Sequence, residues 1–178
     1  MRGLARGALG VVVTAAALAG LLLFLASRDS STFQGTTGPG QVFADQGHQH
    51  LAPGASGAAK FVYDSNPPTS GPHVPVLANR DLQHLSTDEL LQALELGDVV
   101  LVYGDRRLQP GLRRLASSLA GPYSRSLAAA GQAVVLDFQR GRSGVVGVAW
   151  RHLLPSSRPS DPRLQAFIQF WLGRGASG

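Results

Sequence analysis

The stretch Ser86–Tyr103, STDELLQALELGDVVLVY, contains the start and the end of a helix and then a strand. Ser86 and Glu89 form a capping box, in which the serine oxygen accepts from the Glu89 backbone and the glutamate side chain reaches back. Gly97 suits the left-handed conformation that ends many helices. The apolar run Val99–Tyr103 is typical of a strand buried on both faces. This stretch therefore predicts a helix packed beside a central strand.

Further helices and strands are expected on both sides of this stretch. They are a strand at Lys60–Asp64, a helix at Pro110–Leu119, strands at Gln132–Phe138 and Val145–Arg151, and a helix at Asp161–Leu172. A turn-like segment joins the two later strands, so we expect them to form an antiparallel hairpin. The fold class expected is α/β, a single compact domain with a small mixed sheet flanked by helices. The same element order occurs in the thioredoxin fold.

An apolar segment near the N-terminus, Ala8–Ala26, contains no charged residue. As a helix rising about 1.5 Å per residue it would cover roughly 28 Å, close to the hydrocarbon core of about 30 Å. We expect an uncleaved transmembrane anchor, because the run is longer than a usual signal-peptide core and no clear cleavage site follows it; a cleaved signal peptide is the alternative. Arg2 and Arg6 predict a cytoplasmic N-terminus.

The predicted organisation is that of a single-pass membrane protein with one external domain. Its parts are a cytoplasmic N-terminus (1–7), a transmembrane anchor (8–26), a flexible linker (27–44), an extracytoplasmic domain (45–174) and a tail (175–178). The linker is rich in Ser, Thr, Gly and Pro, as flexible tethers are. The membrane, reached through the N-terminal helix, is the only partner that this organisation indicates.

Composition excludes several classes of function. The chain has 178 residues, enough for one domain of ordinary size, and 16 Lys and Arg against 11 Asp and Glu give a net charge of +5. That bias is too weak to indicate nucleic-acid binding. Cysteine is absent, which rules out disulfides, thiolate catalysis and cysteine-based zinc sites. Any metal must be bound by His, Asp, Glu or Met.

The loop Asn66–His73, NPPTSGPH, is stiff and ends on an imidazole. Proline restricts its own backbone and that of the preceding residue, so the loop can present His73 at little entropic cost. His48 and His50 precede it in the motif GHQH, and His84 follows it. Three or four imidazoles suit copper or zinc. The alternative is that these are polar loop residues, with the His73 ring bonded to backbone carbonyls.

Three segments together resemble an uncharacterised bacterial family of membrane-anchored extracytoplasmic domains, a domain of unknown function. They are the loop NPPTSGPH, the helix that leads into the central strand, and the C-terminal VAWR and AFIQFWLGRG. Family members show a Gly-x-x-His element, a nearly identical loop and a helix with His-x-x-Glu-His-Gly. Gly47, His50, His73, Glu95 and Gly97 stand at the matching positions.

Two positions of that helix depart from the family pattern, because Gln92 and Leu96 replace its histidines. The pattern implies two imidazoles that bind one metal ion, with the glutamate as a base or as support for a ligand; inverted zinc peptidases share this spacing. Here only Glu95 is kept. The resemblance therefore implies a degenerate or rearranged site, in which Glu95 is either a base or a partly exposed carboxylate at a helix end.

Three functions are compatible with these patterns. The first is a membrane-anchored domain that binds copper or zinc through His50, His73, His48 and His84. The second is a structural or partner-binding envelope domain that binds no metal. The third, a metal-dependent hydrolase, is disfavoured because the helical histidines are missing, so we expect a binding domain rather than an enzyme.

Overall fold

The computed structural model describes residues 38–55 and 61–176, which lie in one compact unit. The expected anchor, 8–26, lies outside these residues. Among the described helices, none combines the length and the apolar character needed to cross a membrane. The described strands are β1 (Gln41–Val42), β2 (Val99–Tyr103), β3 (Val134–Phe138), β4 (Val145–Ala149) and β5 (His152–Ser156), and the helices are α2 (Thr87–Leu96), α3 (Gln109–Ala120), α4 (Arg125–Ala129) and α5 (Pro162–Trp171).

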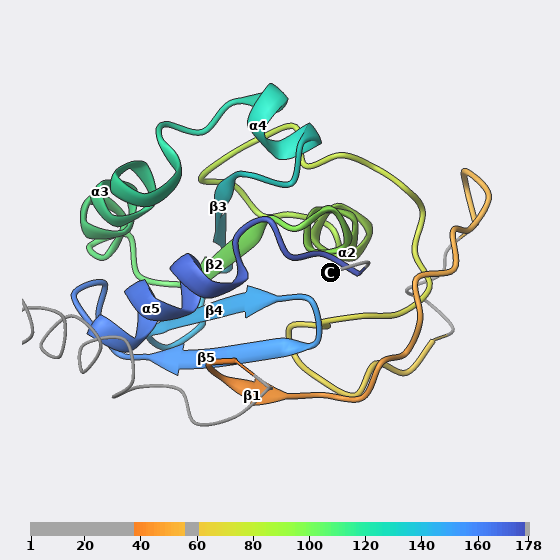
Figure 1. Ribbon diagram of the computed structural model, residues 1–178, viewed down its shortest axis with the longest axis horizontal. Coiled ribbons are helices and arrows are strands. Elements are labelled where there is room, and N and C mark those ends of the chain that lie inside the picture. The colour runs from red at the N-terminus through yellow and green to blue at the C-terminus, as the bar shows by residue number, and fades with distance from the viewer. Residues whose placement is uncertain (1–37, 56–60, 177–178) are drawn as a thin grey trace, which may run out of the picture. The chain divides into compact units, whose positions relative to one another are not determined.

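The described part of the chain forms an α/β domain in three layers, with helices on both faces of a mixed sheet (Figure 1). The strand order is β1-β5-β4-β2-β3. On one face Val100 of β2 packs in a core cluster with Leu94 of α2, and α4 joins the same cluster. On the other face Leu101 packs with Leu112 of α3 and Phe167 of α5. Alternate side chains of β2 thus pack into the cores on opposite faces of the sheet. The predicted α/β class is confirmed.

The predicted helix and central strand are both confirmed. The Ser86 oxygen accepts from the Glu89 N–H at 3.2 Å, and the Glu89 carboxylate accepts from the Ser86 N–H at 2.9 Å, which completes the capping box. Gly97 ends α2 with φ of 113°. All five residues of β2 are buried. Helices α3 and α5 also lie where the sequence predicted them, within one or two residues at each end.

The hairpin predicted between the strands at Gln132–Phe138 and Val145–Arg151, which correspond to β3 and β4, is wrong. Strand β2 lies between them, parallel to β3 and antiparallel to β4. A strand as apolar as β2 must be hydrogen-bonded on both edges as well as covered on both faces, and β3 and β4 supply those edges. The hairpin partner of β4 is β5 instead, across a turn in which Arg151 has φ of 62°.

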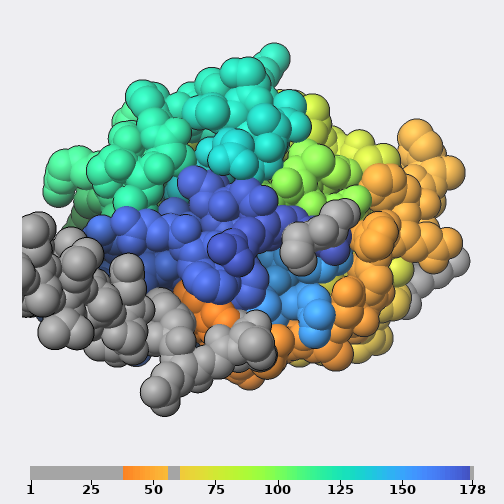
Figure 2. Space-filling model, viewed as in Figure 1, coloured from red at the N-terminus to blue at the C-terminus, as the bar shows by residue number. Residues whose placement is uncertain are grey.

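The sequence placed the start of the domain near residue 45, but described residues before that position already belong to the sheet. Strand β1 pairs with the first part of β5, Gln41 with Leu153. At the far end of the chain, the Trp171 indole N–H donates to the Pro39 carbonyl at 2.8 Å. Figure 2 shows α5 (blue) on this face, between α3 (blue-green) and the orange segment that contains β1. The described residues 38–44 of the expected linker 27–44 therefore belong to the packed structure.

The predicted strand at Lys60–Asp64 is also wrong over its described residues, which form a loop. The rings of Phe61 and Tyr63 pack edge to face, with centroids 5.0 Å apart, whereas Val62 is exposed. The side chains therefore do alternate between partly buried and exposed. This alternation arises because the two rings lie against Gly71 in the proline loop, not because the backbone joins the sheet.

Candidate metal centre

Two histidines are brought together by a short backbone ladder between separate loops. His50 and His73 face each other in a parallel β-bridge. The N–H groups of Gly71 and His73 donate to the carbonyls of Gly47 and Gln49, at 2.7 and 3.1 Å. Paired residues of a ladder project to the same side, so the two imidazoles lie next to each other, with ring centroids 5.4 Å apart.

Buried polar contacts hold the proline loop in place. Ser70 is fully buried; its hydroxyl accepts from the Gln46 N–H at 3.0 Å and donates to the Ala44 carbonyl at 3.2 Å. Tyr63 donates its hydroxyl to the Pro72 carbonyl at 2.9 Å. The two Ser70 contacts tie the loop to the segment that carries His50, and the Tyr63 contact ties it to the chain just before the loop. The stiffness that the prolines predicted is thus reinforced by hydrogen bonds from outside the loop.

Gly71 is required by the conformation of this loop. Its φ is 130°, a value that side-chain-bearing residues rarely adopt. An added Cβ would also lie 2.7 Å from a ring carbon of Tyr63. The residue must therefore be glycine for the ladder and for the position of His73 two residues later.

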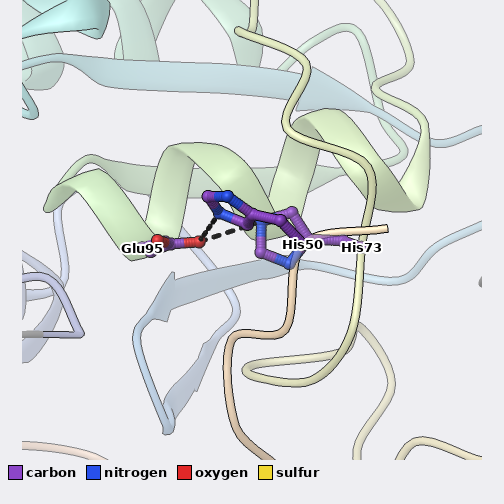
Figure 3. Close-up of side chains that lie close together, drawn as sticks. All are labelled: His50, His73 and Glu95. Carbon is purple, nitrogen blue, oxygen red and sulfur yellow. Dashed lines mark hydrogen bonds and ion pairs between the residues drawn. The ribbon is translucent and has the colours of Figure 1, made fainter. Parts of the chain in front are cut away.

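Glu95 comes from the last turn of α2 and completes the cluster. Its Oε2 lies 3.0 Å from Nε2 of His50 and 3.0 Å from Nε2 of His73 (Figure 3). The helix is tied to the loop at its other end, because the Val74 N–H donates to the Asp88 carboxylate at 2.9 Å. Three segments distant in sequence thus place two imidazoles and one carboxylate around one point.

The tautomer of His73 follows from its surroundings. Its Nδ1 lies 2.9 Å from the Gly71 carbonyl, which can only accept, so Nδ1 carries a proton and donates it. In the neutral ring Nε2 then has a lone pair. This nitrogen is buried, makes no hydrogen bond to any described residue and faces the Glu95 oxygen. Two acceptors that face each other require a cation between them, either a proton or a metal ion.

The geometry is compatible with one metal ion. The three donor atoms all lie within 4.8 Å of one another. Ligands about 2.0–2.1 Å from a tetrahedral zinc lie roughly 3.4 Å apart, and both distances to Glu95 are close to that value. Histidines that bind metals usually donate the second ring nitrogen to a carbonyl or carboxylate, which is the arrangement of His73 and Gly71. His73 is fully buried, whereas the side chain of His50 is 47% exposed.

The other two predicted histidines lie elsewhere. The ring of His48 is edge-on to Trp150, with centroids 6.3 Å apart. His84 places its Nδ1 3.2 Å from the buried carboxylate of Asp137, beside strand β3. Neither belongs to the cluster. Glu95, in contrast, does belong to the cluster. It was expected only as a base or a helix-end carboxylate, and its match to the family pattern was the only signal for a role in the site.

A buried carboxylate follows α2 directly. Asp98 is fully buried; its Oδ1 accepts from the Ala133 N–H at 2.7 Å, and its Oδ2 has no hydrogen-bond partner among the described residues. Burial raises the pKa of Asp98 to about 7, and the hydrogen bond from Ala133 opposes that rise only partly. This group links α2 to strand β3, but it does not reach the cluster of two histidines and Glu95.

The chain belongs to the family described as protein of unknown function (DUF3105), whose model matches residues 56–176. The resemblance to a domain of unknown function is thereby confirmed. His73 and Glu95 lie within the matched residues, and His50 lies just before them. No curated protein and no solved structure matches the chain.

Proposed function

We propose that this protein binds one divalent transition-metal ion, zinc or copper, between His50, His73 and Glu95. The observation that carries the proposal is the 3.0 Å approach of the His73 Nε2 lone pair to the Glu95 carboxylate, with Nδ1 held by the Gly71 carbonyl. A metal ion would accept both lone pairs and that of His50. It would also compensate the burial of an acceptor that otherwise has no donor.

The chemical nature of the three donor atoms restricts which metal ion the site can bind. Two imidazole nitrogens and a carboxylate oxygen, with no sulfur, suit zinc or copper(II); copper(I) prefers thiolate and thioether ligands, and magnesium and calcium prefer oxygen. The exposure of His50 gives an ion a route from solvent. The proposed role is therefore reversible binding of an ion, rather than a closed structural metal site.

The proposed setting is outside the cytoplasm. With residues 8–26 as a membrane anchor and a cytoplasmic N-terminus, the domain would meet its ion in the envelope or at the cell surface. The complete absence of cysteine accords with an ion site built on imidazole in an oxidising compartment. Hydrolysis is a weaker proposal, because Glu95 is used here as a ligand and is no longer free to act as a base.

Metal titration of the full-length chain tests the proposal. Calorimetry with zinc and with copper(II) should give one ion per chain, and His73→Ala and Glu95→Gln should each weaken binding at least about 100-fold. His84→Ala is the matched control, since His84 pairs with Asp137 away from the cluster, and it should bind as the unmutated chain does. His48→Ala should also retain binding.

Two results would contradict the proposal. One is the lack of stoichiometric binding by the unmutated chain, and the other is an equal loss of affinity in His84→Ala and His73→Ala. In the first case a proton would be the shared cation. The three side chains would then form an ion pair that holds the loops against α2. This purely structural role is the alternative to metal binding.

A further inference from the structure

Gln92 carries a buried acceptor on α2, the helix that also carries Glu95. It lies one turn before Glu95, and residues three apart on a helix are neighbours, with Cβ atoms about 5–6 Å apart. The residue is 6% exposed, and its Oε1 makes no hydrogen bond to any described residue. Leaving a buried acceptor without a donor destabilises the folded state, so a group that donates to it should be part of the functional state.

The protein groups that form the metal centre are themselves hydrogen-bond acceptors. Glu95 offers carboxylate oxygens, and the neutral His73 ring offers the lone pair of Nε2. Neither can donate to the Gln92 oxygen while it binds an ion. Water bound to a metal ion can, because the ion takes the electron pair of the water oxygen and leaves both of its hydrogens free to donate.

We propose that Gln92 Oε1 accepts a hydrogen bond from a water molecule that is the fourth ligand of the ion, an inference that rests on the proposed metal site. The ion would then have three protein ligands and one exchangeable position. Zinc sites of this kind are open and exchange their water for small anions, whereas structural sites have four protein ligands. The site would therefore take a small anionic ligand, such as azide, in place of water.

Replacement of Gln92 by leucine separates this role from a structural one. Leucine is of similar size and removes the unpaired acceptor, so the metal-free variant should be at least as stable as the unmutated chain. Its dissociation constant for zinc should nevertheless rise about 10–100-fold, as for the loss of other groups that support metal ligands. Gln165→Leu, at an exposed glutamine of α5, is the control and should leave the affinity unchanged.

A second variant keeps the test decisive if the first folds poorly. Gln92→Glu preserves the acceptor and adds charge, so it should bind zinc more tightly than the unmutated chain. In the cobalt-loaded protein, azide should change the visible spectrum of the unmutated chain. Zinc binding by Gln92→Leu within about twofold of the unmutated chain, or a Gln92→Glu variant that binds no more tightly, would overturn the inference. Absence of zinc binding to the unmutated chain would instead overturn the metal site itself.

Discussion

Two regions of the domain are stabilised in different ways. One is the unit formed by α2 and β2, and the other is the pair of loops that carries His50 and His73. The unit buries apolar side chains, and its helix begins and ends through groups within a few residues of each other. The loops bury few apolar groups and are held by hydrogen bonds between distant segments. Changes to the apolar side chains of the first region should therefore alter stability, whereas changes in the loops should alter the site.

The largest effect on stability is expected in the unit of α2 and β2. Leu94→Ala removes a side chain that is fully buried between α2 and the sheet. Such a truncation costs about 2–5 kcal/mol. Urea unfolding at pH 7 should show this loss, while the zinc affinity of the folded protein should stay within about threefold. A large loss of affinity with little loss of stability would break the contrast between the two regions.

Asp98 provides a pH-dependent test of the same unit. Its pKa, raised by burial to about 7, lies above the ordinary value of 3.8. Between these values the folded state holds a proton that the unfolded state has lost, so stability should fall as pH rises from about 4 to 7 and then level off. Asp98→Asn should remove this decline. Because one pKa unit corresponds to about 1.4 kcal/mol, it should stabilise the protein at pH 8 by up to roughly 4 kcal/mol.

Urea unfolding of both forms at pH 4.5 and pH 8 checks this expectation. The difference between them should be small at the lower pH, where the carboxyl group is protonated in the folded state. An Asp98→Asn variant that is equally or less stable than the unmutated chain at pH 8 would show that the carboxylate is ionised at little cost.

The smallest effect on stability, but a large effect on the site, is expected in the proline loop. Gly71→Ala requires an alanine backbone to adopt a φ of 130°, and it places the new methyl group against the Tyr63 ring. The strain should cost about 1–3 kcal/mol. Because Gly71 also accepts from His73 and donates to Gly47, zinc affinity should fall at least about tenfold. Calorimetry beside urea unfolding measures both, and an unchanged affinity would show that the loop does not position His73.

The same division explains which parts of the fold could be predicted. The caps of α2, the apolar run of β2 and the range of α5 are set by local signals, and each was interpreted correctly. Strand β5 was not predicted, and it contains Pro155, a residue that disfavours strands. The sheet tolerates this proline because β1 pairs only with the earlier residues of β5, so no neighbouring strand among the described residues needs the missing N–H. The pairing of β3 with β4 was wrong because a short linker does not reveal that β2 lies between them.

The candidate site could be predicted only in part. His50 and His73 were named from the sequence and do meet, whereas His48 and His84, chosen on residue type, contact Trp150 and Asp137 instead. Residue type indicates which side chains can bind a metal ion. It does not indicate which of them share one point in space, and for that reason Glu95 was not recognised as the third member of the cluster.

By itself, the sequence determined the start and end of α2, the buried character of β2, the stiffness of the proline loop and the absence of any thiolate. These properties depend on residues within a few positions of each other, whose backbone preferences hold in any fold. Only the tertiary structure decided that His50 and His73 pair in a β-bridge and that Glu95 faces both rings. Those contacts join distant segments, and they form only when the packed core brings α2 against the loops.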